Sequence, residues 1–314
     1  MQKPRILVIG GVSVVQTLSV ESFPDQSGYC EAASFDCLPG GSGTATSVAL
    51  SRLAADSLIC SAIGDDTYGK DMKEYFEAEG VDTRFLSEKK GNCTCLHNII
   101  ERAAKTDKVF FKGAMSSFKK NDVEEAFITY PDGVILHGDV PENIMEETVS
   151  QASKKNIPLF ISSLPDQSKY PLSNIDSCEI LIVDYEEALR CTGIRPSDQE
   201  KCMKACISLM KRVKAKYVII LLEDRGSFIY DGTYYDFIPA YDVHHSSDVD
   251  ISKAFSTALI SEYLRAEGDI RRACDFATIV TALYLTRGGG LRAYPRLDDV
   301  KRFIIRNELD FSLE

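Results

Sequence analysis

The sequence predicts an α/β protein with a central, mainly parallel β-sheet, helices on both faces of that sheet and a small β subdomain. Between residues 133 and 222, short apolar runs alternate with stretches of helical periodicity. This alternation is typical of parallel strands that are covered on both faces. Two further segments, at about 12–38 and 93–112, contain strand-like runs and turns and form the expected β subdomain. We treat residues 1–314 as one domain with these strands inserted.

The first part of the chain is divided by glycine-rich breaks. Gly10 and Gly11 follow the first apolar run, and the break at 39–43 precedes a helical pattern. The expected elements are a strand at 6–9, a helix at 44–55, a strand at 58–63, a helix at about 70–80, and a hairpin of 93–100 with 109–112, joined by the polar stretch 101–108.

In the second part of the chain, strands, turns and helices alternate more regularly. An Asp-Gly pair at 231–232 favours a tight hairpin turn, and the last third is helical. The expected strands are 133–137, 157–162, 180–183 and 217–222, the hairpin is 228–230 with 233–237, and the helices are 141–155, 198–214, 253–266, 269–286 and 297–307.

The composition excludes several classes of protein. Apolar residues make up 44% of the chain, which supplies a sizeable core and argues against disorder. The formal net charge of −11 disfavours binding to a nucleic-acid backbone or an anionic membrane. No apolar run reaches the ~18 residues that span a bilayer, and the N-terminus lacks a signal-peptide pattern. We therefore expect a cytoplasmic protein with no nucleic-acid or membrane partner.

The ten cysteines form no C-x-x-C pair. Cys93 and Cys95 would share one face of a strand, and Cys202 and Cys206 would share one face of a helix. Either pair has the spacing of two metal ligands, but no second ligand pair with zinc spacing follows. We assign no metal site and interpret the cysteines as reduced, mostly buried thiols.

Three segments have the position of a ligand loop, because ligands of open α/β sheets bind beyond the carboxyl ends of the strands. Residues 40–43 precede a helix, whose bare amides favour a polar or anionic group, although a plain tight turn has the same pattern. Residues 64–69 read better as a capped helix start, and 246–252 as a solvated connection.

Together these segments resemble the PfkB, or ribokinase-like, carbohydrate kinase family over nearly the whole chain. The stretch from Gly40-Gly41-Ser42-Gly43 to Leu53 is similar to the family's first signature, and residues 63–69 and 78–82 are similar to its next segments. Residues 184–187 resemble its Asn-x-x-Glu segment, and 221–226 its Thr-x-Gly-x-x-Gly segment. Residues 239–255 match, without a gap, the second signature, which ends in Asp-Thr-Thr-Gly-Ala-Gly-Asp-Ala-Phe.

The resemblance implies a central sheet with a small β lid over the substrate. It also implies transfer of the ATP γ-phosphoryl group to a hydroxyl group of a sugar or nucleoside, with Mg²⁺. Gly40 and Gly41 then belong to the substrate site, while Asp184, Glu187, Leu221, Glu223 and Gly226 belong to the nucleotide and Mg²⁺ region.

The sequence departs from the family at the general base. Lys253 stands where the family has its catalytic aspartate, and an ammonium group with a reference pKa of about 10.4 accepts no proton near pH 7. Asp250, Ile251 and Ser252 replace the Gly-Ala-Gly whose amides form the family's anion hole. Asp248 or Asp250 would serve as base only if the helix began earlier than the match places it.

The substrate and nucleotide contacts depart as well. Val15 and Ala45 replace an aspartate and an asparagine that grip the sugar, which removes hydrogen bonds to hydroxyl groups. Leu221 and Glu223 replace Thr and Gly, and Glu223 sets a carboxylate near the phosphates. Ser247 replaces an aspartate near the family's monovalent-cation site. These changes weigh against both ATP and Mg²⁺, whereas Asp184 for Asn is compatible with Mg²⁺ through water.

Two functions remain open at this point. The first is a ribokinase-fold protein that lacks normal phosphotransfer and acts as a ligand-binding, regulatory or assembly protein. The second is an active sugar or nucleoside kinase with an unusual base. The apolar residues of 93–100 are compatible with a homodimer in which two lids pair, or with a strand edge that is merely covered.

Overall fold

The computed structural model describes residues 3–22, 28–102, 105–244 and 250–313. Within them, the main sheet has the strand order β13-β12-β11-β10-β9-β8-β1-β4-β5. All of its neighbouring strands are parallel, apart from the pairs β11–β12 and β12–β13. The strands are β1 (Arg5–Ile9), β4 (Asp56–Gly64), β5 (Asp82–Lys89), β8 (Gly133–Leu136), β9 (Leu159–Ser162), β10 (Ser177–Val183), β11 (Lys214–Leu221), β12 (Gly226–Tyr230) and β13 (Tyr235–Pro239).

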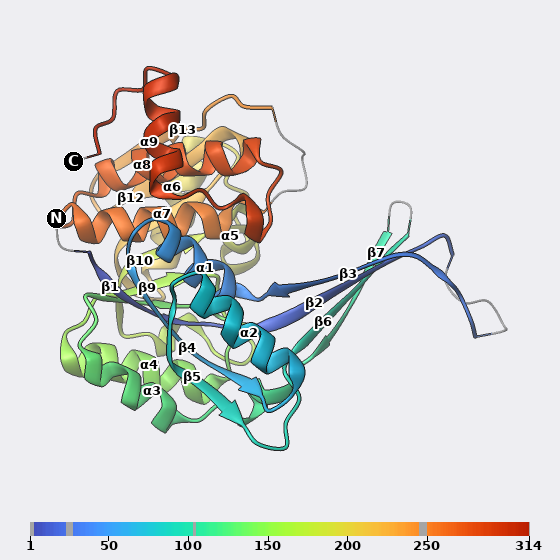
Figure 1. The fold of residues 1–314 in the computed structure, drawn as a ribbon. Helices are drawn as coiled ribbons and strands as arrows, with labels where there is room; N and C mark the ends of the chain where they lie inside the picture. The colour runs from blue at the N-terminus through green and yellow to red at the C-terminus, as the bar shows by residue number, and fades with distance from the viewer. Residues whose placement is uncertain (1–2, 23–27, 103–104, 245–249, 314) are drawn as a thin grey trace.

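Helices cover both faces of this sheet (Figure 1). On β1, Ile6 and Val8 face one core and Leu7 and Ile9 face the other, because successive side chains of a strand point to opposite faces. The first core includes α1 (Ser42–Arg52), α2 (Thr67–Ala78), α7 (Ser252–Arg265), α8 (Ile270–Thr286) and α9 (Leu297–Arg306), and the second includes α3 (Lys120–Ala126), α4 (Glu142–Lys155), α5 (Tyr185–Thr192) and α6 (Gln199–Met210). The predicted fold class is confirmed.

A separate four-stranded sheet, which we call the lid, projects from this body (Figure 1). Its order is β3 (Ala32–Gly40), β2 (Ser13–Val20), β6 (Leu96–Arg102) and β7 (Lys105–Phe111). Strands β2 and β6 are parallel, and the two outer pairs are antiparallel. These strands lie within the segments 12–38 and 93–112, except that β3 continues to Gly40.

The lid differs from the sequence expectation in two details. The polar stretch 101–108 was expected to be a connection, but β6 extends into it as far as Arg102, and β7 begins within it at Lys105, which pairs with Arg102. Charged residues are tolerated there because the side chains of β7 reach solvent. Cys93 and Cys95 do not share a strand face, since both precede β6. Cys93 is exposed, whereas burial raises the pKa of the Cys95 thiol to about 11.

The strand order places a topological switch at the centre of the main sheet. From β1 the chain runs outward to β4 and β5, then returns to β8 on the other side of β1 and continues outward to β11. The carboxyl ends of β1 and β8 therefore meet where the chain changes direction, which is the place where open α/β sheets bind ligands. Strand β2 of the lid follows β1 directly, and β3 leads into α1, so this side of the lid adjoins the switch point.

Candidate functional site

A cleft of about 960 Å³ lies between the lid and the carboxyl ends of the central strands. Its lining comes from the lid, from the starts of α1 and α7, and from the segment after α8. The lining residues are Val15, Leu38, Pro39, Gly40, Gly41, Ser42, Ala45, Arg52, Tyr75, His97, Gly138, Asp139, Ser163, Leu164, Asp250, Lys253, Tyr284, Gly289, Gly290, Leu291, Arg292 and Tyr294.

The floor of the cleft depends on the close approach of α1 to the end of β1. Gly41 precedes α1 with φ of 97°, and a Cβ atom there would lie 2.3 Å from the carbonyl oxygen of Gly11. The Gly43 amide donates to that same oxygen at 2.9 Å. Glycine at position 41 is therefore required by the backbone. The predicted residues Gly40 and Gly41 both line the cleft.

Asp139, which follows β8, is held at the switch point by three contacts. Its carboxylate accepts hydrogen bonds from the Gly11 amide at 3.0 Å and from Ser42 Oγ at 2.7 Å, and the other Ser42 Oγ contact measures 2.8 Å. These contacts join the ends of β1 and β8 to the first turn of α1. Asp139 directly follows a buried strand, and this position is the sequence signal for a residue at the ligand end of the sheet.

His137, at the carboxyl end of β8, is a buried structural residue. Its Nε2 lies 2.9 Å from Thr46 Oγ1, and its Nδ1 contacts the Ser162 carbonyl oxygen. Burial lowers the pKa of His137 to about 4; Asp139 opposes this shift and Lys253 adds to it. The imidazole is therefore neutral near pH 7, and it ties α1 to strands β8 and β9 beneath the cleft.

Lys253 is in the first turn of α7 and lines the cleft, as does Asp250. Its ammonium donates to Ser252 Oγ at 3.0 Å, and Ser252 Oγ donates in turn to Asp250 Oδ1 at 2.6 Å. Burial would raise the pKa of Asp250, but the Lys253 charge and the hydrogen bonds from Ser252 outweigh it, so this pKa is lowered. At this helix terminus an ammonium and an ionised carboxylate are therefore close together.

One amide at the start of α7 is occupied by a side chain of the protein itself. The Ser252 amide donates to Asp250 Oδ1 at 2.8 Å, so the chain's own carboxylate caps the start of the helix. Ile251 adopts φ of −92° in the right-handed region and carries a branched side chain into a neighbouring hollow. Helix α7 begins at Ser252, one residue earlier than predicted, and Asp250 remains outside it. Ser247 and Asp248 lie outside the described residues.

That neighbouring hollow, of about 320 Å³, contains several of the residues predicted for the nucleotide. Leu221, Glu223 and Gly226 line it, together with the carboxylates of Asp224 and Asp242. Glu223 has φ of +57°, a left-handed conformation that favours glycine. Acidic groups around the hollow repel a polyphosphate.

The predicted Mg²⁺ residues are engaged within the fold. Asp184 caps α5 by accepting from the Glu187 amide at 2.7 Å, and Glu187 accepts from the Asp184 and Leu164 amides at 3.2 and 2.8 Å. Burial raises the pKa of Glu187, and Asp184 adds to the rise. Among the described residues, no group of three or more His, Cys, Asp or Glu side chains is arranged to hold a metal ion. The two carboxylates that the resemblance assigns to Mg²⁺ thus already accept hydrogen bonds from amides of the chain itself.

The predicted substrate residues Val15 and Ala45 both line the cleft, Val15 from the lid and Ala45 from α1. Neither side chain can form a hydrogen bond with a hydroxyl group. Val15 pairs with Leu38 on one side and with His97 on the other, and His97 pairs with Phe110. These four residues form one row on the same face of the lid, and we call this row the roof.

The far wall of the cleft was not predicted from the sequence. Arg52, at the end of α1, donates to both carboxylate oxygens of Glu79 at 2.9 and 2.5 Å. It also donates to the carbonyl oxygens of Leu291 and Tyr294 at 2.8 and 3.0 Å. This arginine fixes the segment after α8 against α1, and Tyr284 packs on Tyr294 with ring centroids 4.8 Å apart.

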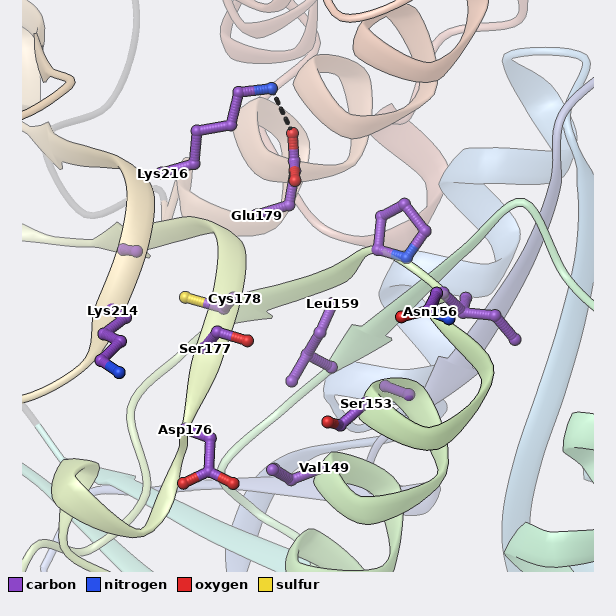
Figure 2. Close-up of a pocket in the computed structure, with 14 residues that line it drawn as sticks. Val149, Ser153, Asn156, Leu159, Asp176, Ser177, Cys178, Glu179, Lys214 and Lys216 are labelled. Atoms are coloured by element: carbon purple, nitrogen blue, oxygen red, sulfur yellow. Dashed lines mark hydrogen bonds and ion pairs between the residues drawn. The ribbon is translucent and has the colours of Figure 1, made fainter.

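A second hollow, of about 550 Å³, lies at the opposite end of the sheet, beside the starts of β9, β10 and β11 (Figure 2). Its main charged contact is the ion pair of Lys216 with Glu179 at 2.6 Å. Ligands of parallel sheets bind at the other end, so we place the functional site in the lid-covered cleft.

The fold and the cleft define a class of protein, an α/β ligand-binding protein whose cleft is covered by a β lid. The model of the pfkB family carbohydrate kinase matches residues 3–296. A ribokinase of Haemophilus influenzae is 24% identical over 307 residues, which cover 96% of this chain and 99% of that protein. A deoxyribokinase of Salmonella typhi is 20% identical over 306 residues, with coverage of 96% and 99%. The chain belongs to the pfkB family of carbohydrate kinases.

Solved structures agree on the fold. The ribokinase of Arabidopsis thaliana complexed with ribose and ATP has a TM-score of 0.88 at 18% identity, covering 99% of this chain and 100% of that one. A nucleoside kinase of Burkholderia thailandensis in complex with inosine has a TM-score of 0.74 at 16% identity, with 98% of each chain covered.

No helix within the described residues has the length and apolar character needed to cross a bilayer. All ten cysteines are free.

Proposed function

We propose that this protein binds a small molecule in the lid-covered cleft and lacks the normal phosphotransfer of its family. The observation that carries the proposal is the start of α7, where Lys253, which the resemblance aligns with the catalytic base, donates to Ser252, and Asp250 accepts from the Ser252 amide. A base must accept the proton of the attacking hydroxyl group, and a protonated lysine does not.

The loss of the anion hole supports the same proposal. A transferring phosphoryl group needs amide donors, and one lost donor costs about 3 kcal/mol of transition-state stabilisation. Here the Ser252 amide is already occupied by the carboxylate of Asp250. A phosphoryl group would have to displace that carboxylate or approach it against like charge.

A second candidate function is an active sugar or nucleoside kinase in which Asp250 is the base. The observation that favours it is that Asp250 is ionised and lines the cleft. Its lowered pKa opposes this role, since a carboxylate stabilised by Lys253 and Ser252 is a weaker proton acceptor.

The test is calorimetric titration with Mg·ATP, followed by an assay of ADP release against a panel of sugars and nucleosides. We expect neither saturable Mg·ATP binding nor substrate-dependent ADP release. ADP release that persists in Lys253→Met and disappears in Asp250→Asn would establish the second candidate. ADP release that disappears in Lys253→Met would assign the chemistry to the lysine.

We further propose that the protein forms a homodimer through its lids and resides in the cytoplasm. Phe35, Val109 and Phe111 of the lid are each at least half exposed, with exposed fractions of 57%, 58% and 50%. By register their side chains lie on the lid face opposite the roof. Val109→Glu should convert a dimer into monomers in analytical ultracentrifugation, and a wild-type protein that sediments as a monomer contradicts the pairing.

A further inference from the structure

The roof of the cleft is mainly apolar and aromatic, and His97 carries its only polar side chain. Its row consists of Leu38, Val15, His97 and Phe110, and the rings of His97 and Phe110 meet edge to face at 6.0 Å. Val15, Leu38 and His97 line the cleft, and Leu38 is 47% exposed, so this part of the row is available to a ligand, whereas Phe110 lies beyond the cleft lining. A flat, apolar molecule gains contact area here, whereas a polyol would lose hydrogen bonds to water without replacing them.

The acidic side chains around the floor are already engaged by the protein. Asp139 accepts from Ser42 and Gly11 with both of its oxygens, and Asp250 accepts from the amide and hydroxyl of Ser252 with Oδ1. The acceptor capacity of these carboxylates toward sugar hydroxyl groups is therefore partly used, and it lies mainly on Asp250 Oδ2.

Lys253 has hydrogen-bond donors available to a ligand, although its charge also acts on Asp250. An ammonium group has three N–H donors, and the recorded contact to Ser252 Oγ uses one of them. No carboxylate of the described residues lies within 4.0 Å of Lys253 Nζ, while Arg52, the other deep cation of the cleft, is paired with Glu79. Asp250 is stabilised by the Lys253 charge and, to a smaller extent, by the hydroxyl and amide of Ser252.

We propose that the cleft binds a small aromatic or heteroaromatic compound with a single carboxylate, its ring under the roof and its carboxylate on Lys253. A monoanion fits better than a phosphate dianion, because Asp250 lies beside the ammonium and repels additional negative charge. This inference rests on the proposed function, since it assigns the ligand class of a cleft that binds without phosphotransfer. The cleft volume of about 960 Å³ accommodates a fused two-ring acid.

The test uses four probes that differ in one feature each, titrated without nucleotide by calorimetry. 2-Naphthoate carries the ring and the charge, naphthalene-2-carboxamide has the same shape without charge, 2-naphthyl phosphate is the dianion, and ribose is the polyol. We expect 2-naphthoate to bind about tenfold more tightly than the amide, which corresponds to ~1.4 kcal/mol. The phosphate should bind no more tightly than 2-naphthoate, and ribose should bind most weakly.

Variants identify the residues responsible. Lys253→Met should abolish the preference for 2-naphthoate over the amide, whereas Lys211→Met, at an exposed position after α6, should preserve it. Val15→Asp should weaken 2-naphthoate about tenfold, because it places a carboxylate in the roof.

Equal affinity for 2-naphthoate and the amide, tighter binding of ribose or of the phosphate, or an unchanged preference in Lys253→Met would overturn the inference. Because these titrations contain no ATP, their result is independent of the ADP-release assay. Substrate-dependent ADP release would thus refute the proposed loss of phosphotransfer without changing the measured ligand preference.

Discussion

Replacing Arg52 with methionine tests how the far wall of the cleft is held. The guanidinium makes hydrogen bonds to both carboxylate oxygens of Glu79 and to two carbonyl oxygens after α8. The Arg52 and Glu79 side chains are only 11% and 12% exposed, so solvent screens the pair weakly. Methionine keeps much of the apolar stem and removes these contacts.

The expected loss is about 3 kcal/mol in the free energy of unfolding. Breaking a buried pair by removing one partner costs roughly 3–5 kcal/mol, and the small residual exposure places this pair at the lower end. Arg296 lies 3.5 Å from Glu79 and compensates part of the lost charge. Equilibrium urea unfolding followed by circular dichroism measures the difference, and Arg302→Met, whose side chain is 76% exposed, is the matched control.

The same pair predicts a pH dependence. The hydrogen bond and charge of Arg52 lower the pKa of Glu79 despite its burial. The pair therefore stabilises the fold above the ordinary glutamate pKa of about 4.3, and this stability is lost as the pH falls through the lowered pKa. The difference in the free energy of unfolding between wild type and Arg52→Met should have its full size at pH 7 and decrease below about pH 4. A gap under ~1 kcal/mol at pH 7, or one that grows in acid, would refute the reasoning.

Three further changes have defined outcomes. Glu223→Gly should stabilise the fold by about 1 kcal/mol in urea unfolding, because Glu223 has φ of +57°, and a loss of stability would contradict this. Gly226→Ala should lower the free energy of unfolding by over ~3 kcal/mol, because its Cβ would lie 2.0 Å from the Ile238 carbonyl oxygen. Gly193→Ala, where φ is +72° and the Cβ would meet open space, should lower it by about 1 kcal/mol. The pKa of His137 is lowered from 6.5 to about 4, so the unfolded chain binds a proton at this residue before the folded chain does. As the pH falls from 6.5 to about 4, the free energy of unfolding of wild type should therefore decrease by about 3 kcal/mol more than that of His137→Asn. Parallel pH profiles of the two proteins would exclude this.

The sequence predicted the elements whose burial is uniform. The run Ile6–Ile9 is buried on both faces, so its apolar continuity identified β1. Strand β5 was not predicted, because its residues Asp82–Lys89 are mixed in polarity and only Leu86 is buried. Helix α5 was also not predicted: it is short, and its start depends on the reciprocal hydrogen bonds of Asp184 and Glu187.

At the site, sequence reasoning identified positions but not contacts. It placed Lys253 after Asp250, yet the chain of hydrogen bonds through Ser252 depends on where α7 begins. The contacts of Arg52 with Leu291 and Tyr294 join residues about 240 positions apart, and no local pattern encodes them. Long-range contacts of this kind are set by the packing of α1 against the segment after α8.

The attachment of the lid has a mechanical consequence. The chain passes between body and lid four times, and two of these passes adjoin the floor of the cleft: β2 follows β1 through Gly10 and Gly11, and β3 returns to α1 through Gly41. The lid cannot tilt without rotating these backbone dihedral angles, and they carry the amides that hold Asp139 and start α1. Strands β2 and β3 thus connect the floor of the cleft with the exposed lid. We expect a ligand in the cleft to change the rate of amide hydrogen exchange in these two strands.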